Sequence, residues 1–119
     1  MGEAIVVVDA DPVRNRELCM VLERQHYAAA ALNSLERLQE HLKKRDCRVI
    51  LLDLDSFPVD SRYIRELLRN NTEAAIIALS SRTFHPELKE AMSTQISACL
   101  NKPLDADELF YWLRSICGN

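Results

Sequence analysis

Four polar residues each follow an apolar run of the sequence, and their side chains could together bind and transfer a phosphoryl group. They are Asp9, Asp53, Ser80 and Lys102. Two carboxylates held close together resist joint ionisation unless a cation compensates. Mg2+ suits such a pair because it prefers hard oxygen ligands and keeps waters and phosphate oxygens in its shell. A carboxylate can attack phosphorus to give an aspartyl phosphate, while a metal and a lysine stabilise the charge that is transferred.

The apolar runs that precede these residues predict buried strands. Residues 4–8, 49–52, 74–79 and 97–100 are short and apolar on both faces, and residues 27–32 form a weaker, alanine-rich strand. Stretches of helical period alternate with them, opened by Asp11-Pro12, by Ser34, near His85-Pro86 and by Asp105. Five strands in alternation with five helices predict an α/β fold with a doubly wound parallel sheet. Ligands of such sheets bind outside the carboxyl ends of the strands, where the four polar residues stand.

Length and composition set the class of protein. The chain has 119 residues, enough for one domain, and 15 basic against 18 acidic side chains give a net charge of −3. No basic stripe favours direct binding of nucleic acid. We expect a cytoplasmic protein with no membrane contact, because the chain shows neither a signal peptide nor an apolar run long enough to cross a bilayer. The four cysteines form no C-x-x-C pair, so we expect reduced thiols rather than a zinc site.

At this point the whole chain resembles the receiver domains of two-component response regulators. The resemblance is carried by residues 5–12, 49–58, 75–81 and 99–103, which read IVVVDADP, VILLDLDSFP, AIIALSS and CLNKP. The Lys-Pro pair after the last strand, at its distance from the other three segments, makes the combination specific. The resemblance implies a flavodoxin-like (βα)5 receiver fold, with residues 1–119 as a single receiver domain.

The resemblance also implies roles for individual residues. Asp53 is implied as the phosphoacceptor, Lys102 as the lysine that contacts the phosphoryl group, and Ser80 as the switch hydroxyl. Asp9 and Asp53 are implied as ligands of Mg2+, together with the backbone carbonyl of Asp55. The implied phosphodonor is a sensor histidine kinase or a phosphotransfer protein. The face made by the fourth helix, the fifth strand and the fifth helix would signal to an output domain or form a homodimer.

Three positions depart from the family pattern. Ala10 replaces the second acid of the usual pair, so one direct magnesium ligand is missing. Cys99 stands where an aromatic residue normally rotates with the switch hydroxyl, so the usual readout is altered or lost. The proline of the loop after Asp53 arrives one residue late, at Pro58, although the overall length of the loop is kept.

Two other acids could replace the ligand that Ala10 lacks. Asp11 is adjacent, but a helix N-cap beside Pro12 is the competing interpretation. The side chain of Asp55 could instead lean over the metal, with a solvated loop acid as its competing interpretation.

Three classes of function remain open from the sequence. The first is a phosphorylatable signalling switch, which catalyses at most its own phosphorylation and dephosphorylation and is otherwise no enzyme. The second is a degenerate pseudo-receiver that acts as a phosphorylation-independent interaction module, which Ala10 and Cys99 favour. The third is a phosphatase, because Asp53-Leu54-Asp55 resembles the D-x-D motif of haloacid-dehalogenase-type enzymes. That family places the motif on its first strand and needs a longer chain, which argues against this interpretation.

Overall fold

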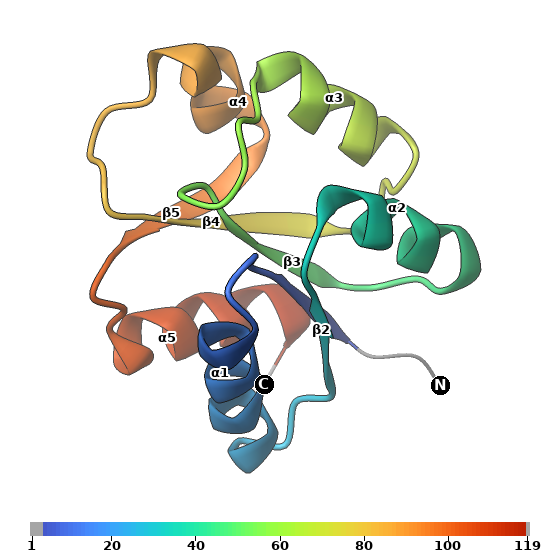
Figure 1. The fold of residues 1–119 in the computed structure, drawn as a ribbon, viewed down its shortest axis with the longest axis vertical. Coiled ribbons are helices and arrows are strands. Elements are labelled where there is room, and N and C mark those ends of the chain that lie inside the picture. The colour runs from blue at the N-terminus through green and yellow to red at the C-terminus, as the bar shows by residue number, and fades with distance from the viewer. Residues whose placement is uncertain (1–3, 119) are drawn as a thin grey trace.

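The computed structural model describes residues 4–118, which form one parallel β-sheet covered by helices on both faces (Figure 1). The sheet has five strands in the order β2-β1-β3-β4-β5. Their bounds are β1 Ile5–Val8, β2 Ala29–Leu32, β3 Val49–Asp53, β4 Ala75–Ser80 and β5 Ile96–Asn101. The order turns back between β1 and β3, so the crevice at this switch point opens at the carboxyl ends of these two strands.

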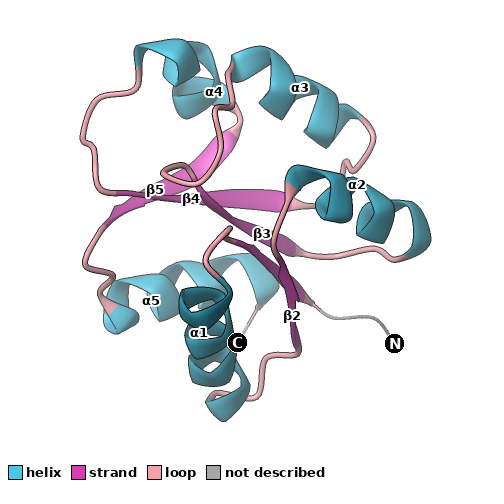
Figure 2. Ribbon diagram, viewed as in Figure 1, coloured by secondary structure: helices cyan, strands magenta, loops and turns pink. Residues whose placement is uncertain are grey.

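The helices lie in two layers, one on each face of the sheet (Figure 2). The bounds are α1 Pro12–Arg24, α2 Leu35–Lys44, α3 Ser61–Arg69, a 3-10 turn η1 Pro86–Leu88, α4 Lys89–Thr94 and α5 Ala106–Cys117. One hydrophobic core joins the sheet to α2, α3 and α4, and a second joins it to α1 and α5. Every residue of β1 and β3 is buried, as a strand covered on both faces requires.

Local sequence signals set where the helices begin. Asp11, Ser34, Asp60 and Asp105 are N-caps whose side chains accept backbone N–H groups of the first turn. Glycine is absent between Gly2 and Gly118, so the turn after α1 uses His26 in the left-handed region, with φ of 70°. The side chain of a non-glycine residue is crowded there, and the turn therefore carries local strain.

The predicted fold class is confirmed, with small shifts at the ends of strands. The weak strand predicted over residues 27–32 begins only at Ala29, and the last strand runs from Ile96 to Asn101 rather than over residues 97–100. Within residues 4–118, no helix is both long and apolar enough to span a membrane.

Candidate functional site

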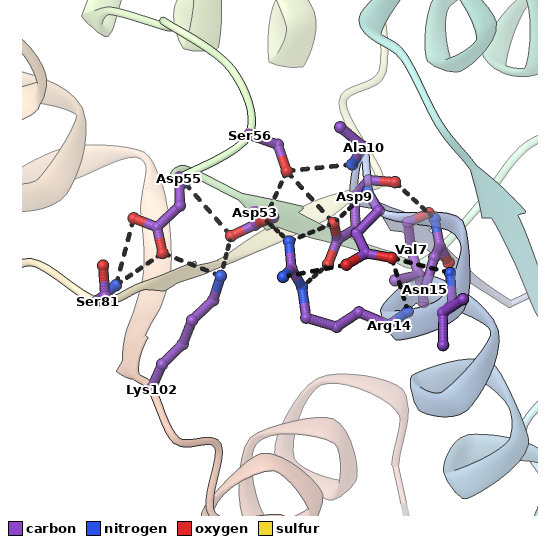
Figure 3. A network of polar contacts seen from close by, with 12 residues as sticks. Val7, Asp9, Ala10, Arg14, Asn15, Asp53, Asp55, Ser56, Ser81 and Lys102 are labelled. Carbon is purple, nitrogen blue, oxygen red and sulfur yellow. Dashed lines mark hydrogen bonds and ion pairs between the residues drawn. The ribbon is translucent and has the colours of Figure 1, made fainter.

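The register of the sheet places the two central carboxylates side by side. Val8 of β1 pairs with Leu52 of β3, so Asp9 and Asp53 follow on adjacent strands at the same edge of the sheet. Both residues are buried, and the Asp53 side chain is only 1% exposed. The predicted meeting of these two acids at the carboxyl ends of the strands is therefore present in the structure (Figure 3).

Lys102 reaches this edge from the end of β5. Its Nζ donates to Oδ1 of Asp53 at 2.6 Å and lies 2.9 Å from Oδ2 of Asp55. Burial would by itself lower the pKa of Lys102, but its hydrogen bonds and charge attraction to Asp53 and Asp55 outweigh burial and raise it. The ammonium group therefore stays charged between two carboxylates.

Asp55 turns toward Lys102 and the loop after β4. Its carboxylate accepts the backbone N–H of Ser81, with distances of 3.0 and 3.3 Å to the two oxygens. Burial alone would raise the pKa of Asp55, but the hydrogen bonds from Lys102 and Ser81 hold it below its usual value. Figure 3 shows this side chain on the opposite side of Asp53 from Asp9. A direct role of the Asp55 carboxylate at a metal remains a prediction.

Ser80 ends β4 next to the acid cluster and is fully buried. Its Oγ accepts the backbone N–H of Arg82 at 3.0 Å, and no described hydrogen bond joins it to Asp53. The hydroxyl therefore anchors the start of the loop between β4 and α4. In its predicted switch role the same hydroxyl would donate its O–H to a phosphoryl oxygen.

Arg14, from the first turn of α1, is a part of the site that the sequence did not reveal. Its Nε donates to Oδ2 of Asp9 at 2.7 Å and its Nη2 to Oδ1 of Asp9 at 2.8 Å. The same Nη2 lies 3.2 Å from Oδ2 of Asp53. One guanidinium thus bridges the two carboxylates (Figure 3). The available signal was its position five residues after Asp9, which brings an early helix residue back toward the end of β1.

Ser56 is a second functional candidate that sequence reasoning missed. Its Oγ lies 2.6 Å from Oδ2 of Asp53 and 3.3 Å from Oδ1 of Asp9, and it accepts the backbone N–H of Ala10 at 3.1 Å. The loop after β3 places it three residues beyond Asp53, close enough to tie that loop to the loop after β1.

Asp53 has four hydrogen-bond donors around its two oxygens. Oδ1 accepts from Lys102 and from the backbone N–H of Asp55 at 3.3 Å, and Oδ2 accepts from Ser56 and Arg14. Each carboxylate oxygen offers about two lone-pair sites, so both oxygens are satisfied without solvent.

Asp9 is held ionised by its partners. Burial alone would raise the pKa of Asp9, but hydrogen bonds from the Arg14 side chain and the backbone N–H of Asp11 outweigh it, and the pKa lies below its usual value. The same contact with Asp9 raises the pKa of Arg14. Arg14 is therefore a permanent positive charge at this edge.

The expected magnesium ion meets a competing cation at this site. Asp9 and Asp53 would be its carboxylate ligands, yet the Arg14 guanidinium lies against both, and Ala10 contributes no oxygen. Asp11 caps α1 by accepting the N–H groups of Val13 and Arg14, which confirms the N-cap interpretation. Within residues 4–118, no three His, Cys, Asp or Glu side chains form a group able to hold a metal ion. As the side chains lie, they do not fit a magnesium ion.

Comparison with known proteins shows the family. The family model for the response regulator receiver domain matches residues 5–114. The chain belongs to this family. Receiver domains are signalling domains of two-component systems, and the family assignment agrees with the parallel sheet and the strand-end acids described above. No curated protein sequence matches this chain.

Three solved receiver-type structures illustrate the likeness. The signal receiver domain of a response regulator from Bermanella marisrubri has 24% sequence identity and a TM-score of 0.81, over 96% of this chain and 97% of that chain. TrrA from Thermotoga maritima, in complex with Mg2+ and BeF, has 17% identity and a TM-score of 0.80, over 97% of this chain and 99% of that chain. A response regulator from Burkholderia pseudomallei, with a phosphorylated aspartic acid, a calcium ion and citrate, has 19% identity and a TM-score of 0.79. The match covers 97% of this chain and 66% of that chain. At these identities the likeness shows the fold.

Proposed function

We propose that this receiver domain accepts a phosphoryl group on Asp53 from a histidine kinase or phosphotransfer protein. The main support for this proposal is the Lys102 ammonium group, which lies 2.6 Å from Oδ1 of Asp53. Asp53 is the last residue of the central strand β3. An oxygen of Asp53 would attack phosphorus as the bond from phosphorus to the donor breaks. Lys102 would stabilise the negative charge on the transferred group, and the Ser80 hydroxyl, at the end of the adjacent strand β4, would donate to a phosphoryl oxygen.

The attack requires one contact of Asp53 to open, because all its lone-pair sites are engaged. The partners of Oδ2 are two side chains, Ser56 and Arg14, and rotation of the Ser56 hydroxyl alone opens one contact without moving the sheet. Oδ1 is held by the backbone of its own loop as well as by Lys102. Oδ2 is therefore the oxygen we expect to attack.

Intact-mass spectrometry after incubation with acetyl phosphate tests the proposal. The parent should gain the mass of one phosphoryl group, and Asp53→Ala should gain none. Asp46→Ala is the matched control, because Asp46 is an exposed acid just before β3, near the opposite end of that strand. Absence of any gain in the parent, with Mg2+ and with a chelator, would contradict the proposal.

The pseudo-receiver remains the second candidate, and the saturated Asp53 favours it. A carboxylate buried with four donors can act as a structural centre for an interaction module that is never phosphorylated. An unmodified parent in the mass experiment would favour this candidate. Steady release of phosphate from unrelated phosphomonoesters would instead favour the phosphatase interpretation.

For the output we propose the face formed by α4, β5 and α5, as a surface for an output domain or a second copy. The Tyr111 side chain on α5 is exposed, whereas Trp112 packs partly against the core. Cys99 on β5 packs against the other core, so a readout through an aromatic rotation at this position is not open to the domain.

A further inference from the structure

Arg14 supplies a cation of the acidic pocket, by which we mean the group formed by the carboxylates of Asp9, Asp53 and Asp55. Its guanidinium makes two hydrogen bonds to Asp9, at 2.7 and 2.8 Å, and the same Nη2 reaches Asp53 at 3.2 Å. Two buried carboxylates on adjacent strands repel each other, and the charge between them is supplied here by the chain itself.

We propose that Arg14 is the built-in cation of this site, which takes the place of the divalent metal ion and excludes it. The domain then keeps its pocket neutralised, and presents Asp53 to a phosphodonor, without Mg2+. The exclusion of Mg2+ stands on the geometry alone. The metal-independent transfer rests on the proposed phosphorylation of Asp53.

The charges of the pocket support exclusion. Three carboxylates, of Asp9, Asp53 and Asp55, face two cations, Arg14 and Lys102, and Arg14 also lies 3.6 Å from the exposed Asp11. A divalent ion placed between Asp9 and Asp53 would lie against the Arg14 guanidinium, and the two cations would repel each other. With Arg14 removed, that repulsion is absent and both carboxylates lose a partner. The pocket therefore favours Mg2+ only in the absence of the arginine.

The backbone holds Arg14 in position before any ligand arrives. Asp11 caps α1 and accepts the N–H of Arg14, and its Oδ2 lies 3.6 Å from Nη1 of the same residue. The next residue, Asn15, is buried and ties the helix to the ends of β1 and β2. The Arg14 side chain is 49% exposed overall, while its guanidinium contacts both Asp9 and Asp53.

The absence of a carboxylate at Ala10 agrees with Arg14 in the place of a metal ion. At Ala10 the site lacks one carboxylate that a metal would use, and its backbone N–H instead donates to Ser56. Ser56 and Arg14 together contact both Asp9 and Asp53. These contacts fill the space between the two acids with donors supplied by the protein.

A titration with Mg2+ alone tests the exclusion, read by calorimetry and by the thermal unfolding midpoint of the full chain. The parent should show no heat of binding and no rise of the midpoint. Arg14→Gln should unfold at a lower temperature without Mg2+, recover with it, and bind Mg2+ at least about tenfold more tightly than the parent. Arg16→Gln, at an exposed position of the same helix, is the control and should behave as the parent.

Equal Mg2+ affinity in the parent and Arg14→Gln would overturn the inference, as would binding by the parent alone. If Arg14→Gln does not fold, the parent titration still decides, since a rise of its midpoint with Mg2+ contradicts exclusion. Arg14→Lys gives a second check, because it keeps the charge and should also exclude Mg2+.

The rate of phosphorylation by acetyl phosphate, with Mg2+ and with a chelator, tests the second part. The parent should react at the same rate in both, and Arg14→Gln only with Mg2+. A parent that reacts only with Mg2+ would overturn the inference. If no variant is phosphorylated while the titration gives the expected difference, the proposed function fails and the built-in cation stands.

Discussion

Single ion pairs determine whether the negative charges of the acidic pocket are compensated. Each neighbouring pair of carboxylates has one cation between it: Arg14 lies between Asp9 and Asp53, and Lys102 lies between Asp53 and Asp55. Breaking a buried pair by removing one partner leaves an uncompensated charge, which costs far more than the pair contributes when intact. The pocket is therefore sensitive to the loss of any one of these five side chains.

Acid should destabilise the protein through this pocket. The pKa of Asp9 is lowered in the folded chain, so the unfolded chain takes up its proton at a higher pH than the folded chain. Its contribution to stability is complete above the unfolded value of about 3.9 and is lost as pH falls through the folded pKa below it. Below about pH 4, the urea midpoint of Asp9→Asn should fall less with decreasing pH than the midpoint of the parent. The control Asp46→Asn should show the same pH dependence as the parent. An identical acid slope in Asp9→Asn and the parent would show that Asp9 carries no such linkage.

At the scale of elements, the docking of α1 against the sheet places the Arg14 side chain at the site. Asn15 is 1% exposed, and its Nδ2 donates to the backbone carbonyls of Val7, Asp9 and Leu32. It therefore joins α1 to the ends of β1 and β2. Because Arg14 precedes it, the same link sets where the guanidinium points.

Asn15→Ala should destabilise the fold by about 1–3 kcal/mol, because the carbonyls of Val7, Asp9 and Leu32 lose the donor that Asn15 supplies. The Leu32 carbonyl keeps a further donor, the backbone N–H of Asp9. The measurement is urea unfolding, with a lower midpoint at an unchanged slope. Arg16→Ala, exposed on the same helix, should change stability by less than about 0.5 kcal/mol. A cost for Asn15→Ala as small as that of the control would mean that the link does not anchor the helix.

At the scale of the whole molecule, the sheet joins two separate hydrophobic cores. Cys47 belongs to the core beneath α2, α3 and α4, and Cys19 to the core beneath α1 and α5. The thiols are free, and burial raises the pKa of each of these two to about 11. Each thiol therefore reports on the opening of one layer.

If the two layers unfold together, both thiols should react with a disulfide reagent at pH 8 only through global unfolding. We expect equal opening free energies for Cys19 and Cys47, equal to that from urea unfolding, in a Cys99→Ser, Cys117→Ser background. The substitutions remove the two half-buried thiols, which would react first. Much faster labelling of Cys19 than of Cys47 would show that the α1 and α5 layer opens by itself.

The sequence by itself determined the architecture and the meeting of Asp9, Asp53 and Lys102. Short apolar runs in alternation with capped helices predict a parallel sheet with helices on both faces, and parallel strands bring their carboxyl ends to one edge. These inferences depend on the path of the backbone, which periodicity predicts.

The tertiary structure alone decided which charges and hydroxyls fill the pocket. The direction of Arg14 depends on the docking of α1 through Asn15, a contact between distant segments. The loop after β3 turns Ser56 toward Asp53 and Asp55 toward Lys102, and no sequence period describes such a loop. A side chain a few ångströms long can reach one charged partner or miss it with a small change of backbone direction, so these contacts appear only once the elements are packed.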